Sequence, residues 1–474
     1  METCHAQAQL AKDSAVARLL DFVQQRSRET APTEDLERFE QKLHEMCSAV
    51  ECEILAEEIS KFDVDVPLLL VDGIPHRQVL RCEETYLGSA GPIRVVRSLY
   101  SDRRNQERAL CPLELRAGIV EGRWTPLAAK QACWVTAHLT PGEGEELFRR
   151  LGGMTPSKSS LDRLPKQVSV RWEADREPFE KSLREAEAVP EGAVSMAVSL
   201  DGVMVPMRDG DRQTKRERTA AAGRPTKGPA GYKEVGCGTV SFYDAEGERL
   251  ATRRMARMPE SKKVTLKQML VAEVHAALTQ RPDLVLVKVA DGAEDNWTFL
   301  AGEQLPPGVE VLDFFHACEH LNGALIAAYG EGNPKRRAQF KKLRTVLRDD
   351  PEGVTKVIRA LAYLRDRHPR RKKVATELRY FRKNRRRMHY ADVAAQNLPI
   401  GSGVIEASCK TLATQRLKRS GMRWRHDGGQ AILTLRAAAQ SDRFDRTWEL
   451  IGATYKAKIE LPENVVALPS HRAA

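Results

Sequence analysis

Apolar residues recur with two different periods along the chain, and each change of period predicts a change of structure. Residues 8–60 place apolar side chains at helical spacing between acidic and basic ones, which predicts helices. Residues 79–120 contain short apolar runs bounded by Gly and Pro, which is typical of small antiparallel strands. Helical spacing returns at Pro126 and continues into a charged helical connector at residues 165–192.

Residues 126–170 predict helices joined by a glycine-containing turn. We expect Thr140 and Thr155 to be N-caps and Gly152-Gly153 to break the helical run. A helix, a turn with Gly and a second helix opening with Ser and Lys form the layout of a helix-turn-helix. Because many helical hairpins bind nothing, a DNA-binding role and a purely structural role are about equally supported.

A new domain is expected to begin at about Ala193, where AVSMAVSLDGVMVPM predicts a buried strand. Residues 207–230 are polar, basic and rich in Gly and Pro, which indicates a mobile loop. A hairpin is expected next, with its turn at residues 244–247. An amphipathic helix follows, with Ser261 as its expected N-cap.

Two further buried strands and a run of helices complete this domain. PDLVLVKVADGAEDNW predicts one strand, and GVEVLDFFHACEHL predicts another that runs into a helix. Residues 325–395 are dense in Arg and Lys at helical spacing, which predicts an all-helical insertion. GSGVIEASCKTLATQRLKRSGMRW then predicts a Gly-bounded helix with Gly421 as its C-cap. This order predicts an α/β domain, a mixed sheet with helices on both faces.

The 474 residues are enough for two or three domains. The patterns predict a mainly helical N-terminal region at 1–78, a small β and helix-turn-helix-like region at 79–190, an α/β domain at 191–440 with the helical insertion at 325–395, and a C-terminal tail at 441–474.

The formal net charge of +11 favours a polyanionic partner, because Lys and Arg release counterions when they meet phosphates. The nine cysteines are scattered without a C-x-x-C pair, so we expect neither a disulfide framework nor a zinc site. No signal peptide and no stretch of about 18 apolar residues is found. We therefore expect a cytoplasmic protein without a membrane role, which would work on the nucleoid if DNA is its partner.

Three carboxylates occupy positions where a charge needs an explanation. Asp201 and Asp291 follow strongly apolar runs, in SLDG and VADG, and Glu406 lies on the last helix, in GSGVIE. In a ribonuclease-H-like sheet the first and fourth strands are neighbours, so the two Asp would meet there. A Glu from a helix on that sheet would complete a site for two Mg²⁺ ions about 4 Å apart, with Mn²⁺ able to substitute.

Each acid also has a structural interpretation. An Asp before Gly is more often a turn residue than a metal ligand, and Glu406 would suit the first turn of any helix. The order of the three residues favours the joint interpretation. Asp295 and Asp313 lie close enough in sequence to be rivals of Asp291 as the second acid.

Other residues near these acids are candidates for supporting roles. Asp313 and His316 form a D-x-x-H element, either accessory to the site or a satisfied His at a strand-to-helix turn. His320 suggests a zinc pair with His316, but no further ligand cluster supports it. Trp424 could stack on an unpaired base, although a core anchor is slightly favoured. The expected DNA-binding set is Lys410, Arg416, Lys418, Arg419, Arg423 and Trp424.

These motifs resemble DDE-type transposases of bacterial insertion sequences, above all the ISKra-type family, which has a Mutator-like layout. The resemblance covers residues 80–450, and its most specific part is GSGVIEASCKTLATQRLKRSGMRW. It implies a ribonuclease-H-like catalytic domain interrupted by a helical insertion. It also implies Mg²⁺-dependent cleavage at transposon ends and strand transfer into target DNA, with Asp201, Asp291 and Glu406 as the catalytic metal ligands.

The implied partners are double-stranded DNA, as terminal inverted repeats and as target, and further copies of the chain in a homo-oligomer. Three alternatives stay open. A ribonuclease-H-like nuclease or resolvase would cut without joining, and a non-catalytic DNA-binding protein would bind without cutting. An RNA-binding or membrane-surface module lacks an aromatic-rich RNA signature and an amphipathic apolar-plus-basic segment.

Overall fold

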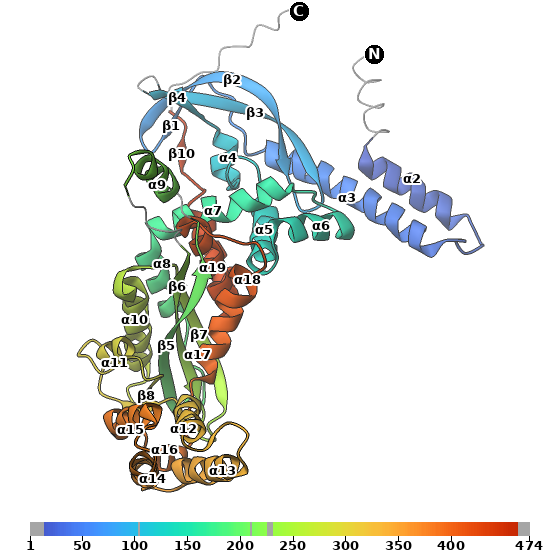
Figure 1. Ribbon diagram of the computed structural model, residues 1–474. Helices are drawn as coiled ribbons and strands as arrows, with labels where there is room; N and C mark the ends of the chain where they lie inside the picture. Colours follow the sequence, from blue (N-terminus) through green and yellow to red (C-terminus); the bar gives the residue numbers. More distant parts are fainter. Residues whose placement is uncertain (1–13, 103–104, 209–210, 225–230, 463–474) are drawn as a thin grey trace, which may run out of the picture. The chain divides into compact units, whose positions relative to one another are not determined.

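The computed structural model describes residues 14–462 except 103–104, 209–210 and 225–230 (Figure 1). The chain divides into two compact units, one formed by Met1–Asp175 with Asp445–Ala474 and the other by Arg176–Phe444. Each contains a five-stranded sheet and several helices, so both are mixtures of α and β structure. Within the described residues, no helix is both long enough and apolar enough to cross a bilayer.

The first unit begins with a helical hairpin and continues into an antiparallel sheet. Its sheet has the order β10-β1-β2-β3-β4, and residues 79–120 supply most of it, as predicted. The C-terminal segment is not only a tail, because its strand β10 pairs with β1. The elements are α2 (Ala15–Ser27), α3 (Leu36–Ser60), β1 (Leu68–Val71), β2 (Ile74–Leu87), β3 (Pro92–Asp102), β4 (Asn105–Leu110) and β10 (Ile459–Glu460).

Four helices complete the chain of the first unit up to its boundary. Thr140 is an N-cap as predicted, in a capping box in which its hydroxyl accepts from Glu143 N–H and the Glu143 carboxylate accepts from Thr140 N–H. The next helix is capped by Ser157 rather than Thr155, because the chain needs an extended stretch after Gly153 before it can turn. The helices are α4 (Pro112–Ala117), α5 (Pro126–His138), α6 (Pro141–Leu151) and α7 (Lys158–Ala174).

The second unit is built on a mixed sheet with the order β7-β6-β5-β8-β9. β5 is antiparallel to β6, whereas β8 is parallel to β5 and β9 is parallel to β8. The hairpin turn at residues 244–247 forms as predicted, with Gly247 at φ +84°. The strands are β5 (Ser195–Pro206), β6 (Tyr232–Tyr243), β7 (Arg249–Arg257), β8 (Val285–Ala290) and β9 (Val309–Leu312).

Two local predictions for this unit are wrong. The expected loop at residues 207–230 contains α9 (Asp211–Ala221), although residues 209–210 and 225–230 lie outside the described part. Ser261 does not cap the helix that follows, because a 3₁₀ turn with Lys262 and Lys263 at positive φ delays the helix start. The helices beside the sheet are α8 (Arg176–Ala186), α10 (Val264–Gln280) and α11 (Glu294–Leu300).

The predicted helical insertion is present and packs on its own apolar faces. Leu347, Val357, Leu361 and Phe381 from successive helices are almost fully buried and join the core of the sheet. Its elements are α12 (Phe314–Tyr329), α13 (Pro334–Asp349), α14 (Gly353–Arg367), α15 (Lys372–Asn384), the 3₁₀ turn η2 (Arg385–Arg387) and α16 (Tyr390–Ala394).

The predicted Gly-bounded helix that begins near Gly403 is broken rather than continuous. A π-helical turn, η3, interrupts it, and its α part ends at Leu417 with Lys418 at the C-cap. Gly421 is therefore not the cap; its φ of +76° serves a turn in the loop that follows. The elements are α17 (Gly403–Ser408), η3 (Cys409–Thr414), α18 (Gln415–Leu417) and α19 (His426–Gln440). The next helix, α20 (Phe444–Ala453), belongs to the first unit from Asp445 onward.

Candidate active site

Two of the three predicted acids lie on adjacent strands of the second sheet. β5 is the first strand of this unit and β8 the fourth, and they pair in parallel, as the sequence predicted of the strands carrying Asp201 and Asp291. The register sets Ser195 beside Val285 and Val198 beside Lys288. If this register continues beyond the paired residues, Asp201 lies beside Asp291. Both acids are then at the carboxyl ends of the parallel strands, where open α/β sheets bind ligands.

Asp201 is half-buried and makes two polar contacts. Its Oδ1 accepts from Gly202 N–H at 2.7 Å, and the Cys409 thiol donates to its Oδ2 at 3.8 Å. Burial raises the pKa of Asp201 above its ordinary value, partly offset by the Gly202 hydrogen bond, and the charge of Asp291 raises it further. The carboxylate of Asp291 is therefore close enough to repel that of Asp201.

Asp291 is held by the turn that follows its strand. Its Oδ1 accepts from Ala293 N–H and from the Asn296 amide, each at 3.1 Å. Asn296 is 5% exposed and its amide also reaches the Leu200 carbonyl at 3.5 Å, on the strand of Asp201. Asn296 thus ties the two strand ends together and fixes one oxygen of Asp291, a role that the sequence did not indicate.

The surroundings of the two rival acids favour Asp291 over both. Asp295 is exposed on α11, and its charge acts on Lys267 of the neighbouring α10. Asp313 is fully buried, and its two oxygens accept backbone N–H groups from His316 and from Ser402. Both oxygens of Asp313 are already committed to holding the backbone.

Asp313 joins the two ends of the helical insertion to each other. It caps α12 through His316 N–H, and it binds Ser402 N–H just before α17. Phe314 N–H donates to the Ile400 carbonyl at 3.0 Å in the same place. The accessory role predicted for Asp313 is therefore that of a staple between these two backbone segments.

Glu406 follows directly from this staple. The Ser402 hydroxyl donates to Glu406 Oε1 at 3.0 Å, so the residue bound by Asp313 also orients Glu406. Glu406 itself is exposed. It lies three residues before Cys409, which contacts Asp201, and residues three apart share one face of a helix. The third acid thus lies one helical turn before the residue that contacts Asp201, on an exposed part of the helix.

The three acids lie on neighbouring elements of the second unit, but their side chains do not form a ready-made set of metal ligands. Within the described part of the chain, no three His, Cys, Asp or Glu side chains stand in an arrangement that could hold a metal ion. The donor chemistry of Asp201, Asp291 and Glu406 suits a hard divalent cation, which binds carboxylate oxygens. A cation between Asp201 and Asp291 would also offset their repulsion.

His316 and His320 contact glutamates other than the predicted metal ligand Glu406. His316 lies 3.5 Å from Glu319, and His320 Nδ1 lies 2.6 Å from the buried carboxylate of Glu377. The His320 ring also stacks on Tyr380 of the insertion, with ring centroids 3.6 Å apart.

Tyr380 explains the glycine that follows Asp291. A Cβ at Gly292 would lie 2.4 Å from Tyr380 Cε2 and 2.7 Å from its hydroxyl oxygen, closer than real Cβ atoms come. Burial raises the pKa of the Tyr380 hydroxyl well above its usual value, and the charges of Asp291 and Asp313 raise it further. The insertion therefore packs directly on the turn that carries Asp291, and glycine at 292 permits this contact.

The predicted DNA-binding residues do not all face solvent. Lys410, Lys418 and Arg423 are exposed and Arg419 is half-buried. Arg416, predicted to contact DNA, is only 1% exposed, and its guanidinium lies 5.4 Å from the centre of the Trp424 ring. A helical period alone does not distinguish this inward position from its exposed neighbours.

Trp424 is an anchor in the core of its unit. Its indole N–H donates to the Leu417 carbonyl at 2.8 Å, and its ring packs on a cluster that includes Val205 and Leu412. Its backbone N–H donates to the Pro206 carbonyl at 3.0 Å. These contacts support the core-anchor interpretation rather than a base-stacking role.

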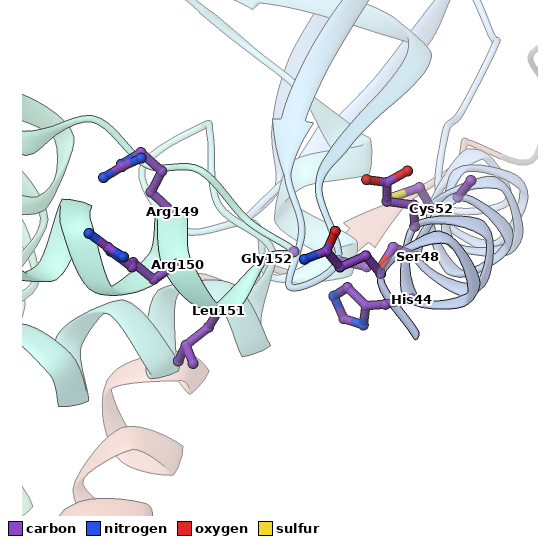
Figure 2. A pocket seen from close by; sticks show the side chains of 12 residues that line it. His44, Ser48, Cys52, Arg149, Arg150, Leu151 and Gly152 are labelled. Carbon is purple, nitrogen blue, oxygen red and sulfur yellow. The ribbon is translucent and has the colours of Figure 1, made fainter. Parts of the chain in front are cut away.

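The first unit has a hollow of its own beside the predicted helix-turn-helix (Figure 2). It is lined by His44, Ser48 and Cys52 of α3 and by Arg149 and Arg150 of α6, whose side chains extend away from α3 in Figure 2. Both arginines form ion pairs with Glu146 on their own helix, the Arg150 pair at 2.7 Å. Because both arginines are already paired with Glu146, the described residues that line this hollow do not indicate a particular ligand.

No protein-family model matches the chain, and no curated protein matches it. A solved structure described as "Drosophila P element transposase strand transfer complex" is similar to it, with 14% sequence identity, over 70% of this chain and 82% of that chain. The TM-score is 0.26. A score this low establishes neither a shared fold nor a shared activity.

The raised pKa of Asp201, caused first by burial and then by the charge of Asp291, predicts an unusual pH dependence of stability. The pKa of Asp201 is higher in the folded state than its unfolded-state value of about 3.9, so the folded protein favours the protonated carboxyl. The contribution of Asp201 to stability is therefore fully present below about pH 3.9 and is lost as the pH rises through the folded-state pKa. Asp201→Asn is therefore expected to raise the stability of the metal-free protein at pH 7 and to change nothing below about pH 3.5. Urea unfolding in EDTA at several pH values measures this.

The matched control for that substitution is Glu246→Gln, which neutralises an exposed carboxylate in the β6–β7 turn. It should leave stability unchanged at both pH values. A loss of stability at pH 7 on Asp201→Asn would contradict the proposed repulsion.

The contact between Gly292 and Tyr380 predicts a strong dependence on the size of residue 292. Gly292→Ala is expected to destabilise the protein by about 1–3 kcal/mol, the usual cost of overpacking, because the Tyr380 ring must move. Gly332→Ala is the control, since a Cβ there meets nothing within 4 Å. In a double-mutant cycle measured by urea unfolding, Tyr380→Ala should relieve most of the cost of Gly292→Ala, and simple additivity would rule out the contact.

Proposed function

We propose that this protein is a DDE-type transposase, which cleaves DNA at transposon ends and joins the freed end to target DNA in a reaction that depends on divalent metal ions. The observation that carries the proposal is the parallel pairing of β5 with β8, whose register brings Asp201 and Asp291 together beside the helix of Glu406. Adjacent carboxylates at the carboxyl ends of parallel strands suit metal-assisted phosphodiester chemistry.

The fold proposed for the second unit is ribonuclease-H-like. Its sheet has the first strand in the centre, the second and third strands on one side, and the fourth and fifth strands on the other. The insertion between Asp313 and Ser402 interrupts the chain before the last acid, as the resemblance to ISKra-type transposases implies. Both features support the proposal.

Asp201, Asp291 and Glu406 would hold two Mg²⁺ ions, for which Mn²⁺ can substitute. When bound, such a pair of ions stabilises the attacking and leaving oxygens of an in-line displacement at phosphorus. Because one oxygen of Asp291 is held by Asn296 and Ala293, its other oxygen is available toward Asp201. Glu406, exposed on the helix whose Cys409 contacts Asp201, would supply the third carboxylate.

The remaining parts of the site position these acids and the DNA. Ser402 orients Glu406, and Asp313 holds Ser402 in turn. Exposed Lys410, on the turn after Glu406, can contact a phosphate of the bound strand. Duplex DNA carrying terminal inverted repeats and target DNA are the proposed substrates, and a homo-oligomer would hold two ends together on the nucleoid.

A ribonuclease-H-like nuclease or resolvase is the second candidate, because it would use the same carboxylates. The resemblance of the segment around Glu406 to transposases favours strand transfer. A DNA-joining assay separates the two, since a nuclease would release cut ends without joining them to a second DNA.

The first expected result is that Glu406→Gln abolishes cutting but keeps DNA binding. With Mg²⁺ and a labelled duplex carrying the terminal repeat, we expect the rate to fall by more than about a hundredfold. Substituting even a residue that only hydrogen-bonds to a metal ligand usually lowers metal affinity or activity by roughly 10- to 100-fold. Cleavage is read on a denaturing gel and binding by anisotropy in EDTA.

Glu246→Gln is the matched control and should cut at the rate of the wild type. If Glu406→Gln also cuts at that rate, Glu406 is a structural helix residue and the proposed site is wrong. If the wild type binds DNA but does not cut it, the protein is a non-catalytic DNA-binding protein.

A further inference from the structure

A basic hollow lies at the far end of the strand that carries Asp201. It has a volume of about 330 Å³ and is bounded by Pro206 at the end of β5 and the adjoining Met207, by Tyr232 at the start of β6, and by the loop after α18. That loop contributes Lys418, Arg419 and Arg423. None of the described residues that line the hollow is acidic. Its chemistry therefore suits an anionic ligand.

The wall of this hollow is fixed to the sheet. Trp424 N–H donates to the Pro206 carbonyl at 3.0 Å, and Arg208 N–H donates to the Trp424 carbonyl at 2.8 Å. The Trp424 indole holds the end of α18 through Leu417. The basic loop between Leu417 and Trp424 is thus anchored at both ends, which places its cations at a set position beside the strand.

Tyr232 gives the hollow an aromatic surface. Its side chain is 60% exposed, at the solvent-accessible start of a strand that is buried from Val235 onward. Cations that follow a phosphate backbone and an exposed ring on which a base can stack form the usual combination of single-strand binding sites. A base in a duplex is covered on both faces by its neighbours, so only an unpaired base can use the ring.

Two elements lead from the acids to this hollow. Along β5, five residues separate Asp201 from Pro206, which is about 17 Å at roughly 3.3 Å per residue. Along the broken helix, twelve residues separate Glu406 from Lys418, which is about 18 Å at roughly 1.5 Å per residue. The hollow is therefore about as far from one acid as from the other.

We propose that this hollow binds one unpaired nucleotide of the DNA strand that is cut, with Tyr232 stacked on the base and Lys418 and Arg423 on the adjoining phosphates. A span of about 17 Å corresponds to at most about five nucleotides at the rise of B-form DNA, about 3.4 Å per nucleotide. The distance to the cut phosphate depends on the function proposed above. The inference that the hollow binds a nucleotide depends only on the residues that line the hollow.

The test uses the whole protein and a forked duplex with a five-nucleotide single-stranded arm, in EDTA so that nothing is cut. 2-Aminopurine, whose fluorescence falls when it stacks, is placed in turn at each nucleotide of the arm. We expect the wild type and Tyr232→Phe to quench one position, and Tyr232→Ala to lose that quenching. Tyr232→Ala should also bind the forked duplex about tenfold more weakly than the wild type does. Its affinity for a fully paired duplex should equal that of the wild type.

Tyr363→Ala is the matched control, because Tyr363 on α14 has the same exposed fraction, 60%, outside the hollow. It should quench like the wild type. The proposal is overturned if the wild type quenches no position, or if Tyr232→Ala quenches as strongly as the wild type. A protein that quenches the probe but does not cut DNA with Mg²⁺ would overturn the proposed function and leave the nucleotide site standing.

Discussion

The parallel pairing of β5 with β8 is the constraint on which the candidate site depends. Its register, continued past Val198 and Lys288, brings Asp201 and Asp291 to the same end of the sheet, and burial first and the charge of Asp291 second raise the pKa of Asp201. Asn296 and the backbone around Asp291 hold the acids in place despite this repulsion. An arrangement that opposes folding at neutral pH is typical of functional sites, where a ligand supplies the missing charge.

The helical insertion leaves the position of Glu406 unaffected because its ends are joined. Asp313 binds the backbone on both sides of the insertion, and Phe314 N–H reaches the Ile400 carbonyl beside it. Insertions that begin and end at one point are tolerated well, since loop closure costs little more as a segment lengthens. Tyr380 then packs on Gly292, so that the insertion also supports the turn of Asp291.

The sequence predicted those features that depend on local pattern. Apolar runs identified the strands before Asp201 and Asp291, and the Gly247 turn and the helical insertion followed from turn chemistry and period. The acids themselves stay a prediction, because no bound ligand tests them. The α/β character of the second unit needed only the order of its elements.

Features that depend on tertiary packing could not be predicted in this way. Arg416 has the same spacing as its exposed neighbours, and only the fold buries it beneath Trp424. Cys409 contacts Asp201, and Asn296 reaches the Leu200 carbonyl on the strand of Asp201, both across large sequence separations. The sequence contains no local signal for such contacts. The start of the helix after Ser261 moved because two lysines adopt positive φ, which their side chains do not favour.

The central claim is that Asp201, Asp291 and Glu406 bind divalent metal together, and anomalous scattering tests it most directly. Crystals of the protein with a DNA end would be grown with Mn²⁺, and an anomalous map calculated at the manganese edge. The account predicts peaks between Asp201 and Asp291, with a Glu406 oxygen coordinating one of the ions. Manganese bound elsewhere, with these three carboxylates free of metal, would contradict it.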